Sequence, residues 1–274
     1  MSKVTIGEFL DNSYLKATKY NQEREGVKLL LLEYLDYSDS DLLLNKDKEL
    51  ENEDLVKLNM LIDDYVIKNI PPQYILGYAY FYGMKLKVNP SVLIPRFDTE
   101  VLVDVVLNNI KGNERIIDVG SGSGAISLAI KKERPNVIMS GVDISLEALE
   151  VAKSNKEALG LDIEYYQSDL LSNTFIYDVI VSNPPYIKEG DKISDLVYQN
   201  EPHLALFAKE NGLYFYRRIL KDANLHLREG GKIFFEIGYD QKEGIEKLVK
   251  EIMPEKKVEF FKDYGGRFRV AYIH

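Results

Sequence analysis

Hydrophobic residues recur every three or four positions from Thr5 to about Asn69, and this spacing predicts helices. Thr5 followed by Glu8 has the pattern of a capping box, in which a hydroxyl and a carboxylate satisfy the free amides at a helix start. A further helix is expected over residues 54–68. The pattern stops at two prolines after residue 70, because proline has no amide hydrogen to donate. We therefore expect a small helical domain over residues 1–75.

The hydrophobic pattern changes after this domain. The aromatic-rich stretch 78–88 alternates as a short hairpin does, and we expect a linking β-hairpin within residues 76–90. Over residues 91–274, apolar runs of strand length alternate with helical periods, which predicts an α/β fold with a doubly wound, seven-stranded, mainly parallel sheet. The expected strands span residues 115–119, 137–143, 163–167, 177–182, 232–236, 257–262 and 268–273, and the expected helices span 99–109, 124–133, 145–159, 213–227 and 242–251.

Composition narrows the chemistry that this fold can carry. The chain has 274 residues, 45% of them hydrophobic, so it can bury a full core. It has no cysteine, and its histidines, His203, His226 and His274, are scattered, so we expect no metal site. The first residues lack a signal pattern, and no apolar stretch approaches the roughly 18 residues that span a bilayer. We expect a cytoplasmic protein without a membrane partner.

The formal net charge of −9 argues against direct nucleic-acid binding, because phosphate contacts need clustered Lys and Arg. The acidic excess is larger in residues 1–80, which hold 15 Asp and Glu against 9 Lys and Arg. An acidic helical surface is either a solvated face or a docking surface for a partner, and the sequence leaves both open.

A glycine-rich loop, Asp118–Ala125, lies between an expected strand and an expected helix. Its spacing satisfies the dinucleotide pattern G-x-G-x-x-G/A, and Asp143 ends the next strand, where an acidic residue would bind a ribose diol. NAD and S-adenosylmethionine both fit this arrangement. Asp118 favours S-adenosylmethionine, because a carboxylate there would repel a pyrophosphate and attract the ammonium group of a methionine. The helix start behind Gly124 can hold the methionine carboxylate.

The tetrapeptide Asn183-Pro184-Pro185-Tyr186 follows the apolar run 177–182. We interpret it as a socket, that is, a binding site for a planar NH2 group. Methylation of such a nitrogen requires both hydrogens to be held and the lone pair to be aimed. Asn183 and a backbone carbonyl can accept the hydrogens, and Tyr186 offers an aromatic face. Pro184 has no amide hydrogen and Pro185 keeps its predecessor out of the helical region, so the loop stays open. The alternative is a rigid turn after a strand.

Several motifs together resemble the peptide-chain release factor glutamine methyltransferases, the HemK/PrmC family. They are Ile94–Glu100, Asp118–Ala125, Gln167–Asp169, Val181–Ile187, Glu201-Pro202 with Ala205-Leu206, and Asp263–Val270. The resemblance runs from about residue 71 to the C-terminus, with a small helical domain in the expected place before it. One departure is Phe97, where the family usually has proline, so the entry loop has a different shape.

The resemblance implies a class I S-adenosylmethionine methyltransferase fold and methyl transfer to the glutamine of the Gly-Gly-Gln loop of release factors. We further expect that the helical domain docks this protein substrate, that no nucleic acid binds directly and that the enzyme acts as a monomer. The implied cofactor-binding residues are Gly120, Ser121, Gly122, Ser123, Gly124, Asp143, Leu170 and Asn183, with Asp143 at the ribose and Leu170 at the adenine. The implied catalytic residues are Asn183, Pro184, Pro185 and Tyr186.

Two other classes remain open. A nucleic-acid adenine methyltransferase uses the same tetrapeptide, but it needs a basic groove that this acidic chain lacks. A nicotinamide-dependent oxidoreductase or a nucleotide-binding module would need only the glycine loop. The stretch 187–210 has no clear period and is expected to form a lid or substrate wall. Arg96 would either contact the release factor or brace Glu100, and His203 is expected to be a loop residue without a catalytic task.

Overall fold

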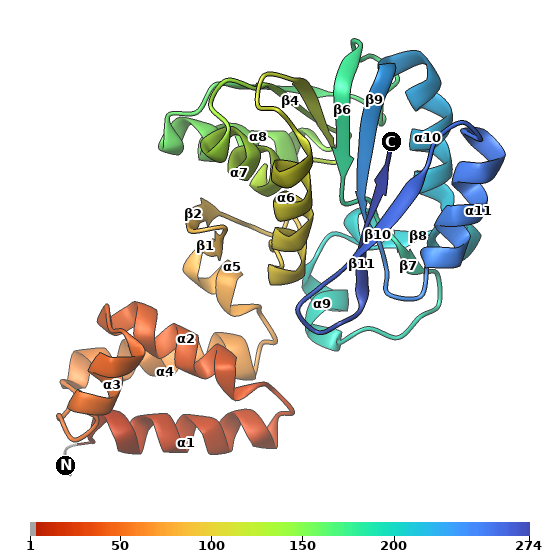
Figure 1. Ribbon diagram of the computed structural model, residues 1–274. Coiled ribbons are helices and arrows are strands. Elements are labelled where there is room, and N and C mark those ends of the chain that lie inside the picture. The colour runs from red at the N-terminus through yellow and green to blue at the C-terminus, as the bar shows by residue number, and fades with distance from the viewer. Residues whose placement is uncertain (1–3) are drawn as a thin grey trace. The chain divides into compact units, whose positions relative to one another are not determined.

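A computed structural model describes residues 4–274 of the chain (Figure 1). The chain forms two compact units. The first runs to Gly77 and also includes Ile193–Asn200, whereas the second comprises Tyr78–Lys192 and Glu201–His274. Among the helices of the described residues, none combines the length and the apolar character that a membrane span requires. The same residues contain no group of three or more acidic or histidine side chains arranged to hold a metal ion.

The first unit is helical, as the hydrophobic spacing predicts. Its helices are α1 (Ile6–Lys19), α2 (Arg24–Leu35), α3 (Asp39–Asn45), α4 (Asn52–Val66), α5 (Pro72–Leu76) and α9 (Asp195–Asn200). The capping box of Thr5 and Glu8 is present at the start of α1. Leu30, Leu58 and Ile62 lie in the core that these helices share. The short helices α3 and α5 follow Ser38 and Pro71 and are too brief to show a hydrophobic period.

The segment that carries α9 joins the helical unit although it lies far along the sequence. Leu196 packs against the helical core. The Asn200 side chain donates a hydrogen bond to the Asn69 carbonyl at 2.7 Å, and the Asn69 amide donates to Gln199 at 2.9 Å. A segment within the expected lid, 187–210, is therefore anchored to the helical unit. The boundaries 1–75, 76–90 and 91–274 did not include this return of the chain.

The second unit contains the predicted seven-stranded sheet, in the order β10-β11-β9-β6-β3-β4-β5. Neighbouring strands from β9 to β5 pair in parallel, whereas β11 runs antiparallel to both β9 and β10. Its strands are β3 (Arg115–Val119), β4 (Ile138–Asp143), β5 (Ile163–Gln167), β6 (Tyr177–Ser182), β9 (Leu227–Glu236), β10 (Val258–Lys262) and β11 (Phe268–Ile273). The predicted hairpin is β1 (Tyr78–Phe81) paired with β2 (Met84–Lys87). The fold class is confirmed.

Helices cover both faces of this sheet (Figure 1). One face packs on α6 (Phe97–Asn109), α7 (Ala125–Glu133) and α8 (Leu146–Leu159), and the other on α10 (Tyr214–His226) and α11 (Lys242–Ile252). Successive strand residues enter opposite cores: Ile116 lies in the first and Ile117 in the second, as the period of two in a strand requires. All five helices match the predicted ones to within two residues.

The stretch after β6 contains short elements instead of one long loop. A two-residue strand β7 (Ile187–Lys188) pairs in parallel with β8 (Phe207–Ala208). The 3-10 turns η1 (His203–Ala205) and η2 (Glu210–Gly212) lie on either side of β8. This stretch therefore returns to the carboxyl end of β6 and is held there by backbone pairing.

Candidate active site

A cavity of about 370 Å³ opens at the carboxyl ends of β3, β4 and β6, where parallel sheets bind ligands. It is large enough for a nucleoside-sized ligand. Of the residues selected from the sequence, those in its wall are Gly120, Ser121, Gly122, Ser123, Asp143, Leu170, Asn183, Pro184 and Pro185. Gly124 and Tyr186 lie outside the wall. The structure thus brings residues from three strand ends to one cavity, while their roles toward a cofactor stay predictions.

The glycine loop needs glycine for two different reasons. Gly120 and Gly122 have φ angles of +77° and +54°, which side chains rarely adopt, and a Cβ there would meet no atom within 4 Å. Gly124 also has a positive φ angle, of +82°, and in addition packs closely, since a Cβ there would lie 2.6 Å from the Tyr165 hydroxyl. Gly124 therefore sets the packing at the start of α7 and does not line the cavity.

Asp143 is held by backbone amides at the end of β4. One carboxylate oxygen accepts the Gly122 amide at 2.9 Å, and the other accepts the Ser145 amide at 3.0 Å. Burial raises the pKa of Asp143, and the hydrogen bonds from these amides act against that shift. Each oxygen keeps further acceptor capacity. A fixed pair of acceptors facing the cavity fits the two hydroxyls of a ribose.

Asp118 does not occupy the place that the sequence argument gave it. Its side chain is fully buried below the glycine loop, and it is absent from the cavity wall. Neither carboxylate oxygen has a hydrogen-bond partner that meets standard geometry within residues 4–274. Burial raises the pKa of Asp118 to about 7. The central strand β3 points the Asp118 side chain into the protein. Asp118 is therefore not placed to contact the ammonium group of a bound methionine directly.

Leu170 lines another part of the cavity in a strained conformation. Its φ angle of +53° is uncommon for a residue with a branched side chain, and such strain concentrates at functional sites. The adjacent Asp169 accepts two hydrogen bonds, of 3.1 and 3.0 Å, from the Arg218 guanidinium. Phe215, which the aromatic run 213–216 suggested to be a packing residue between helix and sheet, lies in the same wall. Leu170 and Phe215 give the cavity apolar surface of the kind that holds an adenine ring.

Asn183 presents an open acceptor at the cavity. Its side-chain nitrogen donates to the Thr99 hydroxyl at 3.3 Å, and no described residue donates to its oxygen. The Pro184 carbonyl likewise accepts no hydrogen bond from residues 4–274. Two acceptors thus stand free beside each other, as a socket for an NH2 group requires.

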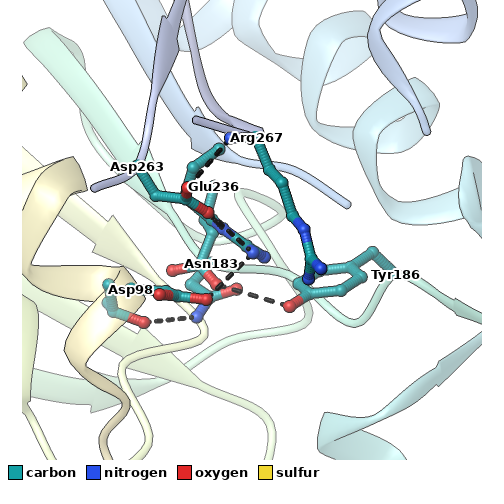
Figure 2. A network of polar contacts seen from close by, with 8 residues as sticks. Asp98, Asn183, Tyr186, Glu236, Asp263 and Arg267 are labelled. Atoms are coloured by element: carbon teal, nitrogen blue, oxygen red, sulfur yellow. Dashed lines mark hydrogen bonds and ion pairs between the residues drawn. The ribbon is translucent and has the colours of Figure 1, made fainter. Parts of the chain in front are cut away.

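Tyr186 does not line the cavity, and its hydroxyl points into a polar cluster (Figure 2). Its hydroxyl donates to a Glu236 carboxylate oxygen at 3.4 Å. Its own carbonyl accepts the side-chain amide of the buried Gln241 at 3.2 Å, and the same amide donates to the Gly212 carbonyl at 3.2 Å. Burial raises the pKa of Tyr186, so the hydroxyl stays protonated at neutral pH. Its expected packing on the substrate amide is not tested by these contacts.

Comparison with known proteins agrees with this site and with the helical unit. Residues 96–206 match the methyltransferase small domain, and residues 12–77 match the PrmC N-terminal domain. The release factor glutamine methyltransferase of Streptococcus pneumoniae is 38% identical over 272 residues, which cover 98% of both chains. That of Lactococcus lactis is 41% identical and covers 84% of this chain and 87% of its own. The chain belongs to the release factor glutamine methyltransferase family.

Solved structures of lower identity support the fold of this family member. A methyltransferase from Pyrococcus furiosus aligns with a TM-score of 0.54 at 19% identity, over 80% of this chain and 96% of its own. A 16S rRNA methyltransferase from Thermus thermophilus aligns with a TM-score of 0.51 at 20% identity, over 71% of this chain and 48% of its own. The match to the methyltransferase small domain covers the glycine loop, and it therefore excludes the nicotinamide-dependent alternative.

Arg96 braces a residue other than the expected one. Its guanidinium forms an ion pair with Glu201, whose side chain is almost fully buried and also accepts the Ile94 amide at 3.1 Å. Glu100 instead accepts the Tyr82 amide at 2.7 Å. The bracing of Glu100 by Arg96 is therefore wrong, because the motif places Arg96 before α6 and Glu100 on its first turn. Glu201 thus holds the segment 94–96, of which Pro95 and Arg96 line the cavity.

Proposed function

We propose that the protein transfers a methyl group from S-adenosylmethionine to the side-chain amide nitrogen of glutamine in the Gly-Gly-Gln loop of release factors. The observation that carries the proposal is the pair of free acceptors, Asn183 Oδ1 and the Pro184 carbonyl, at the cavity. Membership of the family supports the choice of substrate. We further propose that the enzyme works in the cytoplasm as a monomer, and that its helical unit docks the release factor.

The residues around the cavity fit the proposed cofactor. Asp143 offers two fixed acceptors for the ribose hydroxyls, and Ser123, in the cavity wall just before α7, keeps a backbone amide that donates to no other described group and could meet a carboxylate. Leu170 and Phe215 provide an apolar surface for the adenine. When bound, S-adenosylmethionine supplies an electrophilic methyl group on a sulfonium.

The side chains of the socket act by positioning. An amide NH2 group is flat, and its lone pair is delocalised into the carbonyl. Asn183 Oδ1 and the Pro184 carbonyl would each accept one of its hydrogens, which fixes the plane of the group and leaves the lone pair directed at the methyl group. Such positioning is worth roughly 7–11 kcal/mol of barrier when the geometry is good. The proton can leave to water after the transfer, so the site needs no general base.

The test is single-turnover methyl transfer to a release factor with saturating S-adenosylmethionine, scored by the mass of the Gly-Gly-Gln peptide. Asn183→Ala should slow transfer by about 10²–10³-fold, as removal of one preorganised polar group does, with little change in cofactor affinity. Asn183→Asp should also be slow, because its negative charge stabilises the sulfonium ground state more than the transition state.

Asn113→Ala is the matched control, since Asn113 is exposed on a loop away from the cavity wall. It should transfer at the wild-type rate. Transfer by Asn183→Ala at that same rate would refute the proposed role of the socket. Methyl groups found on DNA adenine, or on a residue other than the glutamine, would refute the proposed substrate.

A further inference from the structure

Thr99 is a buried hydroxyl between the socket and a buried carboxylate. It lies on the first turn of α6 with only 4% of its surface exposed. Its oxygen accepts the Asn183 side-chain amide at 3.3 Å. The Thr99 hydroxyl also acts on Glu236, the buried last residue of β9, whose second carboxylate oxygen has no hydrogen-bond partner that meets standard geometry in the described chain. Burial raises the pKa of Glu236 to about 7, and the Thr99 hydroxyl acts against this shift as a donor.

The direction of these hydrogen bonds decides which way the Asn183 amide points. The oxygen and nitrogen ends of an Asn side chain have nearly the same shape, so packing alone does not choose between them. Thr99 has one proton to donate. An ionised Glu236 can only accept, so it draws that proton and leaves the Thr99 oxygen as an acceptor for the Asn183 NH2 group. The Asn183 oxygen then faces the cavity.

The reverse orientation would disable the socket. An Asn183 NH2 group turned toward the cavity would meet the substrate NH2 group, and two donors cannot hydrogen-bond to each other. The proposed substrate would lose one of its two acceptors. A residue that controls this choice therefore controls the rate without touching the substrate.

Charged and polar residues hold Glu236 in place (Figure 2). Tyr186 donates to its first carboxylate oxygen at 3.4 Å from the loop after β6. The buried Arg269 of β11 lowers the pKa of Glu236 by its charge, whereas Asp98 of α6 raises it. Arg269 itself forms ion pairs with Asp98 at 2.9 Å and Asp263 at 3.1 Å. Glu236 thus accepts one hydrogen bond from the socket loop and feels the opposite charges of Arg269 and Asp98.

We propose that Thr99 and Glu236 are positioning residues that fix the amide of Asn183 with its oxygen toward the substrate. The inference rests on the proposed methyl transfer to a glutamine amide. It adds two residues, outside the tetrapeptide, that set the polarity of the socket.

A pair of substitutions at Thr99 separates positioning from packing. Thr99→Val keeps the shape and removes the hydroxyl, whereas Thr99→Ser keeps the hydroxyl and removes a methyl group. At pH 8, Thr99→Val should lower kcat by about 10–100-fold, as loss of an orienting partner does at other sites, with little change in KM or cofactor affinity. Thr99→Ser should keep most of kcat. A packing role predicts the opposite order, because Ser leaves a cavity and Val does not.

Coupling to Asn183 gives the second readout. If Thr99 acts through Asn183, adding Thr99→Val to Asn183→Ala should cost less than a further twofold in kcat. Glu236→Gln, which can donate as well as accept, should lower kcat by about 10-fold or more, and it serves if a Thr99 variant folds poorly.

The outcomes distinguish this inference from the function on which it rests. Absence of methyl transfer by the wild-type enzyme overturns the proposed function. Wild-type transfer together with equal rates for Thr99→Val and Thr99→Ser, or a faster valine variant, overturns the positioning role and leaves the function standing. Full additivity with Asn183→Ala also overturns it.

Discussion

Gly212 fixes the backbone of the socket loop, and its replacement by alanine should distort that loop. Gly212 has a φ angle of +82°, and a Cβ there would lie 2.2 Å from the Tyr186 carbonyl oxygen and 2.5 Å from the Gln241 amide nitrogen. The left-handed conformation alone costs a non-glycine residue roughly 1–2 kcal/mol. The clash is with backbone, so the Tyr186 carbonyl must move and give up its hydrogen bond from Gln241, which costs about 1–3 kcal/mol more.

Gly230→Ala is the matched control for this prediction. Gly230 has a similar φ angle of +72°, but a Cβ there would meet nothing within 4 Å. The control should show the conformational cost alone, which corresponds to a Tm loss of about 2–8 °C in a protein of this size. Gly212→Ala should lose about twice as much by calorimetry, and its kcat for a release factor should fall at least 10-fold because Tyr186 lies two residues from Pro184. Equal Tm losses and wild-type turnover in Gly212→Ala would refute the role of this close contact.

Further substitutions test the cofactor site, the surface of the helical unit and the buried carboxylate of Glu236. Asp143→Ala should weaken S-adenosylmethionine binding in calorimetry by roughly 1–3 kcal/mol through unpaired ribose hydroxyls, and an unchanged affinity would remove Asp143 from that role. Replacing Leu43 and Leu44, which are 74% and 83% exposed on the helical unit, by Ser should raise KM for a whole release factor, whereas Leu225→Ser, at a site 78% exposed in the other unit, should not. Glu236→Gln should gain stability over the wild type as pH rises from 5 to 8, by up to about 3 kcal/mol in melting experiments, and a constant difference would contradict the raised pKa of Glu236.

The sign of the last prediction follows from the proton balance of Glu236. Its pKa is raised from 4.5 to about 7 by burial, so the folded state binds the proton more tightly than the unfolded state. Between these two values the folded wild type holds more protons, and its stability falls as pH rises. A glutamine at this position does not titrate. The variant therefore gains relative stability through the same interval.

The sheet was predictable because each of its strands and helices carries its own periodicity. The expected strands 115–119, 163–167, 177–182 and 268–273 agree with β3, β5, β6 and β11 at both ends. Strand β9 begins at Leu227, five residues before the expected start, because its first residues are exposed and polar and show no apolar run. The anchoring of α9 to the helical unit was not predictable, since it depends on contacts of Asn200 and Leu196 with residues more than 100 positions away.

The tetrapeptide and the glycine loop were visible in the sequence because backbone chemistry imposes their residue types. Gly120 and Gly122 are required by their φ angles, and Pro184 and Pro185 by an open loop. Asp118 was chosen for its distance from the loop, and that distance does not say whether a side chain faces the cavity or the core, where the structure places it. Thr99 lay within the motif Ile94–Glu100 without an assigned role, and Glu236 was only the expected end of a strand. They are a helical threonine and a strand-end glutamate, which become partners only when α6 packs beside β9.

Glu236→Gln is expected to raise the stability of the protein at pH 8 and to lower kcat. Together, the two effects distinguish a role in the fold from a role in the reaction. Burial of the Glu236 carboxylate costs stability when the group is charged, and a neutral isostere of the same shape removes that cost. If Glu236 served the fold, its replacement would destabilise the protein and lower activity through unfolding. A variant that is more stable at pH 8 and yet slower in methyl transfer leaves only a role in the chemistry. Functional residues often lower the stability of the fold that carries them. Glu236 would be such a residue, because it acts on the reaction through Thr99 and Asn183.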